Sequence, residues 1–358
     1  MAERGTFLKL SMNACRQRRY TILIFIVQAL ITAVLVTQRR PCDLDKPQQY
    51  TKVNLWTDTT KQNSTPQSGY GWKTIAACSD PGLKILYMVH TNPEGIEERM
   101  WLRNTIGDPH VQALVSSSVV FFAGASPHLE LQWVLQEEAY NEGDLVLLNL
   151  TETRRNLPHK FFLGARWILE NCHLDSTVAL VKLEEDVLVN VFALSSYVSS
   201  SLMWLPGIHC LVRTNITAVR RRSSSWYVSR DEYAPDVFPD YCAGEAIIMK
   251  PTTLTRLVDA AAAVPYFWIG HIYATGMVAD FANVDLVDLS EHVIEKKPKE
   301  LTTVGDTTLF VYTRLAGVSD DHKESLWEDI LRSNQTAPRD FRKNVEVYYR
   351  SVGSTNIA

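Results

Sequence analysis

Three consecutive acids, Glu184, Glu185 and Asp186, follow an apolar run that begins at Val178. The run is typical of a buried strand, and an open α/β sheet binds its ligand where such strands end. Carboxylates at that position provide the hard oxygen ligands with which a divalent cation sits against phosphates. The segment therefore predicts a nucleotide-sugar site, and the alternative is a solvated acidic turn.

The sequence around this run alternates between strand and helix patterns. Apolar segments that favour strands lie at 84–90, 119–123, 145–148 and 178–183, and segments with helical spacing lie at 97–105, 129–141 and 161–170. Strands that alternate with helices form a mostly parallel sheet that helices cover on both faces. The predicted fold class is therefore α/β, with an edge strand at 308–312 and a short helix at 324–331 near its end.

Composition places the chain among ordinary globular proteins. Its 358 residues are 46% hydrophobic and 21% charged, which gives room for one large domain or two small ones. The net charge of -4 provides no basic field, so nucleic acid is not expected as a partner.

Residues 20–37 form an uncharged apolar run of near-spanning length, which predicts one membrane helix. Basic residues dominate positions 1–19 and favour a cytoplasmic tail, and a cleaved signal peptide is the alternative. The polar segment 38–77 is typical of a stem. We expect a lumenal domain at 78–340 and a carboxyl-terminal tail at 341–358. Because the apolar run is short, we expect a single-pass type II protein of the Golgi membrane.

Four N-glycosylation triplets lie beyond the apolar run, which fits a lumenal glycoprotein. Their acceptor residues are Asn63, Asn149, Asn215 and Asn334. Asn149 lies so near a predicted strand that burial is an alternative for it.

Five cysteines lie in the same part of the chain, where an oxidising lumen permits disulfides. Cys78 and Cys172 lie beside predicted elements of the first half. Cys210 and Cys242 flank one loop region. These two pairings are the ones we expect, although connectivity does not follow from spacing alone.

Six short blocks follow one another in order between residues 78 and 283. They comprise Arg99, Leu102, Arg103 and Thr105; Phe121–Gly124; Glu138, Tyr140, Gly143, Asp144 and Leu145 with Asn149–Thr151; Lys182–Asn190; Trp226–Ser229; and Phe238–Gly244. In these residue types and this order the chain resembles the Golgi β-1,3-glycosyltransferases. That family includes β-1,3-galactosyltransferases, β-1,3-N-acetylglucosaminyltransferases and, more distantly, Fringe.

The resemblance implies a Rossmann-like fold of the GT-A type and an inverting transfer from UDP-galactose or a UDP-N-acetylhexosamine. The implied acceptor is a 3-hydroxyl of a glycan on a glycoprotein or glycolipid. The implied cofactor is Mn²⁺, which bridges the phosphates of the leaving group. As protein partners, a second copy of the chain in a homodimer and a partner transferase are both open alternatives.

The resemblance also assigns roles to charged residues. Asp186 is the expected metal ligand, Glu184 is expected to point toward the ribose or sugar of the donor, and Glu185 is either a secondary ligand or an outward acid. Arg103 and Lys182 are candidates to hold phosphate or carboxylate charge, and the alternative for both is a structural ion pair.

Trp226, Gly244 and Glu245 belong to the acceptor side that the resemblance implies, where a glycine lets the backbone approach a ligand closely. The basic run 220–222 in the same region is either a solvated turn or a contact with phosphate or acceptor.

Two departures from the family pattern matter. Glu184 and Glu185 stand where the family has aspartates, and the longer arms are expected to weaken the donor site. Gly270 and His271 stand where the family has an acidic pair that takes the proton from the acceptor hydroxyl. His271 is a competent base near neutral pH and is the expected catalytic residue, while Glu245 is a distant second base. The open alternative for His271 is a structural imidazole.

Two classes of function follow from these observations. The one we favour is an active UDP-sugar-dependent β-1,3-hexosyltransferase. The alternative is a catalytically silent lumenal relative that binds glycans or acts as a chaperone.

Overall fold

The computed structural model describes residues 71–202, 206–295, 301, 303–314 and 317–333. The expectations for the cytoplasmic tail, for the apolar run 20–37 and for most of the stem lie outside these residues, as do those for Asn63, Asn334 and the tail 341–358. Within the described part, no helix combines the length and the apolar character that a membrane crossing needs.

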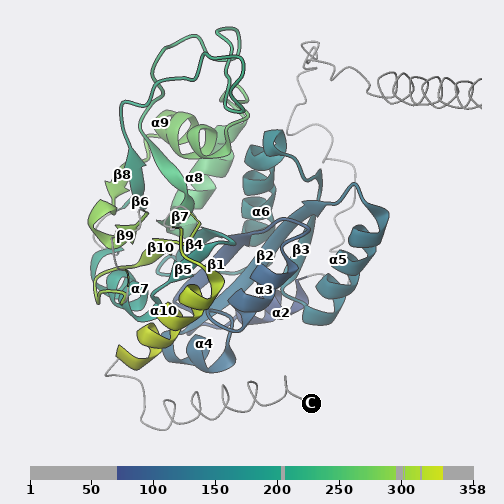
Figure 1. Ribbon diagram of the computed structural model, residues 1–358, viewed down its shortest axis with the longest axis vertical. Coiled ribbons are helices and arrows are strands. Elements are labelled where there is room, and N and C mark those ends of the chain that lie inside the picture. Colours follow the sequence, from purple (N-terminus) through teal and green to yellow (C-terminus); the bar gives the residue numbers. More distant parts are fainter. Residues whose placement is uncertain (1–70, 203–205, 296–300, 302, 315–316, 334–358) are drawn as a thin grey trace, which may run out of the picture. The chain divides into compact units, whose positions relative to one another are not determined.

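The predicted α/β fold with a mostly parallel sheet is confirmed (Figure 1). Seven described strands form the large sheet in the order β3-β2-β1-β4-β7-β6-β8, and among them β7 alone runs antiparallel to its neighbours. Their bounds are β1 Ile85–His90, β2 Ser117–Ala125, β3 Leu145–Thr151, β4 Ala179–Glu184, β6 Ile208–Arg213, β7 Tyr241–Met249 and β8 Leu286–Asp288. Because β7 is reversed, its first half lies beside the carboxyl end of β4, where Leu183 pairs with Ala246.

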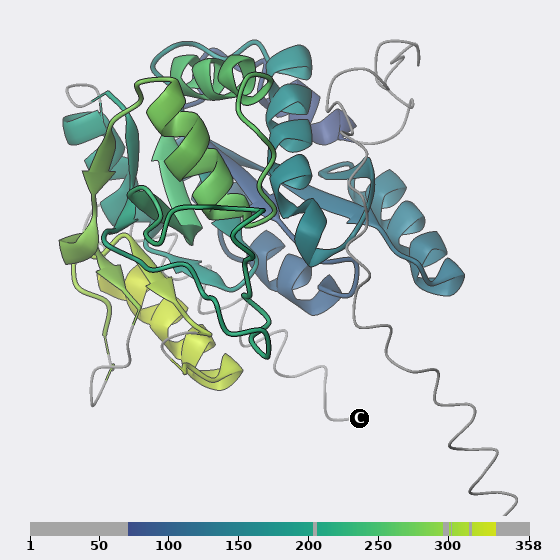
Figure 2. The same cartoon turned by 90° about the horizontal axis from the view of Figure 1, so that it is seen from above.

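Helices lie on both sides of this sheet (Figure 2). The helices are α2 Trp72–Ala77, α3 Ile96–Arg103, α4 Pro109–Val115, α5 Leu129–Glu142, α6 Leu157–Asn171, α7 Val191–Tyr197, α8 Pro251–Ala261, α9 Val278–Phe281 and α10 Asp320–Ser333. The short helical turns are η1 Arg154–Asn156, η2 Val198–Leu202, η3 Ile272–Met277 and η4 Ser290–His292. The helices expected at 97–105, 129–141 and 161–170 correspond to α3, α5 and α6.

The alternation of side chains along β1 explains the two helical layers. All six residues of β1 are buried, and neighbouring residues of a strand point to opposite faces. Tyr87 and Val89 belong to the core that also contains residues of α3, α4, α5, α7 and α10. On the other face, α6 packs against β1, β2, β3 and α8.

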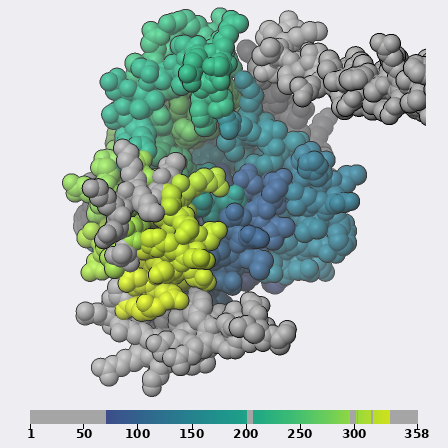
Figure 3. Space-filling view, in the orientation of Figure 1, coloured from purple at the N-terminus to yellow at the C-terminus, as the bar shows by residue number. Residues whose placement is uncertain are grey.

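A second sheet of three described strands, in the order β5-β10-β9, follows the acidic run. Its strands are β5 Val187–Val189, β9 Val293–Ile294 and β10 Phe310–Tyr312. The predicted edge position of the strand at 308–312 is wrong, because β10 pairs with β5 on one side and β9 on the other. Both partners are too short for a pattern to reveal. The core of this sheet includes α10, which lies beside the segment that contains α3 (Figure 3). Lys323 Nζ in α10 lies 4.5 Å from the ring centre of Trp101 in α3.

The folded part begins before residue 78, where the stem is predicted to end. Trp72–Ala77 form α2, and Thr74 Oγ1 donates a hydrogen bond of 3.1 Å to the carbonyl of Val119 in β2. The next residue, Cys78, is disulfide-bonded to Cys172 after α6, which is one of the two pairs expected from the sequence. A helix of six residues is too short for its apolar spacing to be recognised.

Residues 214–240 form a long loop between β6 and β7, which is the uppermost segment of Figure 1. Cys210 and Cys242 are disulfide-bonded at its base, and this is the second expected pair. Arg220 is not a solvated cation, because its guanidinium donates to four backbone carbonyls between residues 228 and 235. The next two residues of the basic run, Arg221 and Arg222, are exposed.

Candidate active site

The carboxyl edge of β4 carries the acidic run and lies beside an irregularity in β7. β7 pairs with β6 through Cys242 opposite Val212 and through Ile247 opposite Cys210. The register shifts between these two pairs, because β7 has more residues there than β6. Bulges of this kind redirect the local backbone and are frequent beside active sites. Here the bulge brings the carbonyl of Gly244 to the ammonium of Lys182, which also pairs with Glu184. Lys182 is buried, whereas 40% of the Glu184 side chain is exposed.

Glu185 turns into the protein. Its carboxylate accepts hydrogen bonds from Thr91 Oγ1 at 2.6 Å, from the Asn92 backbone N–H at 3.0 Å and from Asn92 Nδ2 at 2.8 Å. Burial raises the pKa of this carboxyl group. The contacts of Glu185 match neither of its two predicted roles, a secondary metal ligand or an outward acid. Glu185 instead fixes the loop that follows β1. The sequence gives no sign of this contact, since the two partners lie more than ninety residues apart.

Asp186 is paired with a cation of the chain itself. Arg314 Nε lies 3.2 Å from Asp186 Oδ2. The backbone carbonyl of Asp186 accepts hydrogen bonds from the Thr313 N–H at 3.2 Å and from Thr313 Oγ1 at 2.5 Å. Arg314 follows β10, and β10 pairs with the strand that begins directly after Asp186. The acid expected to hold a metal ion thus faces a guanidinium.

These contacts do not fit the manganese ion that the family resemblance implies. A divalent cation at a diphosphate is held by one or two carboxylates together with the phosphate oxygens, and those carboxylates must be free of other charged partners. The three acids instead face three separate partners, which are Lys182, the loop after β1 and Arg314. Among the residues that the structure describes, no three His, Cys, Asp or Glu side chains gather closely enough to hold an ion. The predicted metal site is therefore not assembled, because each carboxylate is directed to a neighbour of its own.

Arg103 has the structural role that was the alternative to donor binding. Its guanidinium contacts Asp144 at 2.7 and 2.9 Å and Glu138 at 2.8 Å. Glu138 also pairs with the fully buried Arg99 at 2.6 Å. These four residues of the family blocks form an ion-pair network that joins α3 to α5 and the start of β3.

The acceptor-side residue Trp226 forms an aromatic platform with Trp268, Arg154 and Arg155. The two indole rings are stacked, with 6.0 Å between ring centres and 11° between planes. Arg154 lies 4.8 Å from the ring centre of Trp226, and Arg155 lies 4.9 Å from that of Trp268. Trp226 is 42% exposed and the guanidinium of Arg154 lies over its ring, so the platform is an aromatic surface that carries positive charge. The buried Nε1 of Trp268 has no hydrogen-bond partner among the described residues.

His271 lies between the aromatic platform and Gly244. Its ring centre is 6.4 Å from that of Trp226, and a Cβ added to Gly244 would lie 3.3 Å from His271 Nδ1. Burial, together with the nearby charge of Lys182, lowers the pKa of His271 to about 4. The imidazole is therefore neutral at physiological pH and able to accept a proton.

Gly270 and Glu245 limit the other ways in which this site could hold a base. A Cβ at Gly270 would lie 3.2 Å from Leu157 Cβ at the start of α6, so the first acid of the family pair has little room. Glu245 lies on the β7 bulge next to Gly244, and burial raises the pKa of its carboxyl group. The predicted acceptor-side residues are thus brought together, with His271 beside Gly244 and Trp226.

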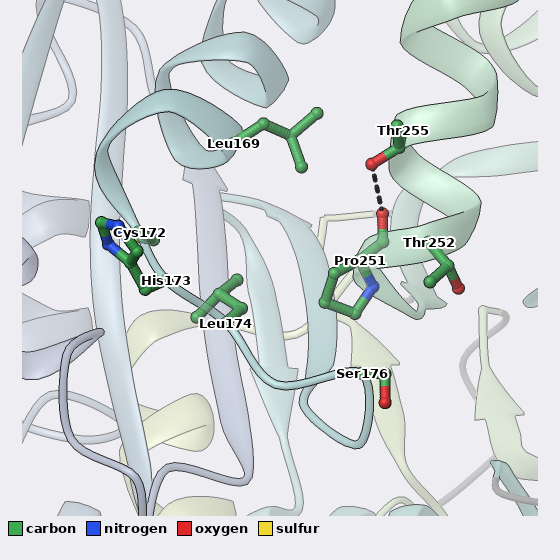
Figure 4. Close-up of a pocket in the computed structure, with 8 residues that line it drawn as sticks. All are labelled: Leu169, Cys172, His173, Leu174, Ser176, Pro251, Thr252 and Thr255. Atoms are coloured by element: carbon green, nitrogen blue, oxygen red, sulfur yellow. Dashed lines mark hydrogen bonds between the residues drawn. The ribbon is translucent and has the colours of Figure 1, made fainter.

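A separate pocket lies at the opposite edge of the sheet (Figure 4). It is a cavity of about 310 Å³ between the connection from α6 to β4 and the first turn of α8, with Leu174 and Pro251 among its lining. Met249 at the end of β7 pairs with Leu180 near the start of β4, so this region is remote from the acidic run. The candidate active site is the carboxyl edge of β4 and not this pocket.

Two of the predicted glycosylation acceptors are described. Asn149 lies in β3 and Asn215 in the loop 214–240, and both are exposed. Burial of Asn149, the alternative considered for it, is therefore wrong.

Three residues of the site were not found from the sequence. Arg314 follows the short apolar strand β10, and a cation directly after a strand was the only sequence signal for its place in the site. Trp268 lies three residues before the expected base, where an aromatic side chain next to a sugar site is informative. Arg154 follows β3, so its place at the carboxyl edge of the sheet could have been inferred.

A family model described as galactosyltransferase matches residues 97–290, which is more than half of the chain and includes the acidic run and His271. The chain therefore belongs to the galactosyltransferase family.

Individual relatives are distant. The chain is 20% identical to human beta-1,3-galactosyltransferase 5 over 205 residues, which cover 57% of this chain and 65% of that protein. It is 27% identical to lactosylceramide 1,3-N-acetyl-beta-D-glucosaminyltransferase A of Danio rerio over 196 residues, which cover 51% of this chain and 50% of that protein. The chain thus spans between half and two thirds of the length of these relatives.

Solved structures give weaker similarities. The galactosyltransferase LgtC in complex with donor and acceptor sugar analogs matches with 8% identity and a TM-score of 0.33, over 72% of this chain and 99% of that chain. A 4-diphosphocytidyl-2C-methyl-D-erythritol synthase matches with 12% identity and a TM-score of 0.34, over 57% of this chain and 88% of that chain. Similarities this low add nothing to the fold described above.

Proposed function

We propose that the chain is an inverting glycosyltransferase that moves galactose or an N-acetylhexosamine from a UDP-sugar to a 3-hydroxyl of a glycan. The chain belongs to the galactosyltransferase family, and one structural observation supports the proposal. Gly244 touches both halves of the site, since its carbonyl accepts from Lys182 and its Cα faces His271. The charged end of β4 and the acceptor-side residues therefore share one small region, as a transfer between two bound substrates requires.

In this reaction the acceptor hydroxyl forms a bond to the anomeric carbon of the donor while the bond from that carbon to UDP breaks. The hydroxyl proton passes to His271, and the leaving UDP takes the electron pair. A pKa of about 4 for His271 is close to that of an ordinary aspartic acid, which is the residue type that the imidazole replaces. Burial thus gives this histidine about the basicity of the family carboxylate, while keeping it unprotonated at neutral pH.

The aromatic platform supplies the acceptor contact in this proposal. Sugar rings place C–H groups against aromatic side chains, and Trp226 is 42% exposed, stacked against Trp268 and covered in part by the guanidinium of Arg154, which can donate to sugar hydroxyls. Trp226 lies at edge-to-face distance from His271, so an acceptor on the indole lies close to the base.

The location in the Golgi lumen, with the chain anchored by residues 20–37, is part of the same proposal. Its support within the described residues is the pair of disulfides, since such bonds persist in oxidising compartments. Exposure of Asn149 and Asn215 is consistent with their use as glycosylation acceptors there.

A second candidate is a silent relative that binds nucleotide or glycan without turnover. The observations that favour it are the lack of room for an acid at Gly270 and the separate partners of the three acids of the run. Such a protein would keep the aromatic platform as a glycan contact and lose the transfer step.

Release of UDP from a panel of UDP-sugars, with a mixture of glycan acceptors and the full-length protein, separates the two. Acceptor-dependent UDP release that His271→Ala abolishes is the result we expect. UDP or glycan binding with no turnover from any donor would support the silent relative. Binding of neither would overturn both functions.

A further inference from the structure

Backbone pairing places Arg314 next to Asp186. β10 ends at Tyr312, which pairs with Val187, the residue directly after Asp186. Thr313 then donates its N–H and its hydroxyl to the carbonyl of Asp186, at 3.2 and 2.5 Å. The small sheet therefore brings the backbone of Arg314 to the end of the acidic run, from where its side chain reaches the carboxylate of Asp186.

The ion pair uses one part of the guanidinium. Nε faces Asp186 Oδ2 at 3.2 Å, and 70% of the Arg314 side chain is exposed. The described residues provide no further partner for its two terminal nitrogens. A guanidinium with free terminal N–H groups matches the oxygens of a phosphate in a two-pronged contact.

A divalent cation on Asp186 would lie against this guanidinium. Like charges at such short range repel, so the ion could bind only after Arg314 had left the carboxylate. Glu184 does not offer an uncompensated charge in exchange, because one of its oxygens pairs with Lys182, and Glu185 is closed off by Thr91 and Asn92.

We infer that Arg314, and not a divalent cation, neutralises the diphosphate of the donor in this chain. The inference rests on the proposed function, because it concerns the UDP part of the same site. Asp186 then acts as a positioning residue that holds the guanidinium at the end of β4. The same pair makes UDP binding independent of added metal ions.

The test is the affinity of the full-length protein for UDP, measured by calorimetry with EDTA and again with Mn²⁺. The parent is expected to bind UDP with affinities that agree within about threefold in the two buffers. Arg314→Ala is expected to weaken binding about tenfold or more in EDTA, because a charge-assisted contact is lost. Added Mn²⁺ is expected to restore binding to this variant, because Asp186 is then free to accept the ion.

Two further variants test whether a change in UDP affinity is specific to the guanidinium of Arg314. Arg230→Ala removes another exposed arginine, which pairs with Asp236 at 2.6 Å in the loop 214–240, and it should leave UDP binding unchanged. Arg314→Lys keeps the charge but not the fork, so its affinity in EDTA should lie between those of the parent and Arg314→Ala.

Two results would overturn the inference while leaving the proposed function intact. One is a parent protein that binds UDP with Mn²⁺ and not with EDTA. The other is an Arg314→Ala variant that binds UDP in EDTA as tightly as the parent does. Absence of UDP binding in both buffers would instead defeat the proposed donor, and the inference with it.

Discussion

The donor side and the acceptor side of the site treat their polar residues in opposite ways. On the donor side, Arg99, Glu138 and Glu185 are buried or nearly so, and each has its hydrogen-bonding groups engaged within the chain. On the acceptor side, Trp226 is exposed, and the buried N–H of Trp268 has no hydrogen-bond partner among the described residues. A family block can therefore be kept because it builds the scaffold, and the residues that are available for chemistry lie elsewhere.

The largest effect is expected where the donor side is broken. Arg99→Ala should lower the free energy of unfolding by about 3–5 kcal/mol. The substitution leaves a cavity and removes one of the two arginines that pair with the partly buried Glu138. Denaturant unfolding of the purified protein measures the loss. Arg230→Ala, which removes an exposed ion pair, is the control and should change stability by no more than about 1 kcal/mol. Equal stabilities for the two variants would contradict a structural role for the donor-side network.

On the acceptor side, a change should reduce turnover and leave the fold intact. His271→Ala is expected to lower kcat about a hundredfold or more, with UDP affinity unchanged, because only proton transfer is lost. His271→Asp restores the family residue type and should recover part of this activity.

The pH dependence of kcat sharpens the same test. With a pKa of about 4 for His271, the acid limb of the profile should lie near pH 4 and not near the value of an ordinary histidine. A limb near pH 6.5 would show that the imidazole is not the base or is not buried in the active protein.

Burial of His271 should also be visible in stability. Its pKa is lowered to about 4 in the folded protein, so between pH 6.5 and pH 4 the unfolded chain binds a proton that the folded chain does not. The free energy of unfolding should therefore fall by about 3 kcal/mol as the pH decreases through this window. The contribution is isolated by subtraction of the His271→Ala curve, because burial raises the pKa of Glu185 and Glu245 and they act in the opposite direction. His173→Ala, which changes an exposed histidine, should reproduce the parent curve.

The smallest effect is expected at the aromatic platform. Trp226→Ala should raise the acceptor KM about tenfold and leave the donor KM unchanged, because one stacking face is lost. Trp133→Ala, which removes an exposed tryptophan of α5, is the matched control. A similar rise in acceptor KM for both variants would remove the distinction between the two sides.

Much of the fold was accessible from the sequence, because its strands and helices carry strong patterns. The buried strand before the acids, the α6 helix and both disulfide pairs are present where the sequence places them. The small sheet was not accessible, since β5 and β9 have three and two residues and lie a hundred residues apart.

The roles of the acids were harder to predict than their position. The three adjacent acids at the end of β4 point in three directions, and a segment distant in sequence sets each direction. Asn92 holds Glu185, and Arg314 holds Asp186. Glu184 pairs with Lys182, which the carbonyl of Gly244 holds in place. The alternation of a strand fixes direction only while the strand continues, and here it ends at Glu184.

The disulfide between Cys210 and Cys242 closes the loop 214–240 into a ring whose two ends leave the sheet at one point. A ring of this kind can be replaced by one of another length or sequence without displacing the strands that anchor it, since the added cost of closing a longer loop grows slowly. Trp226 lies on the ring, whereas His271 and the acidic run lie outside it. Under the proposed function, exchange of this single segment between relatives is thus a simple route by which acceptor choice can diverge while the reacting groups stay the same.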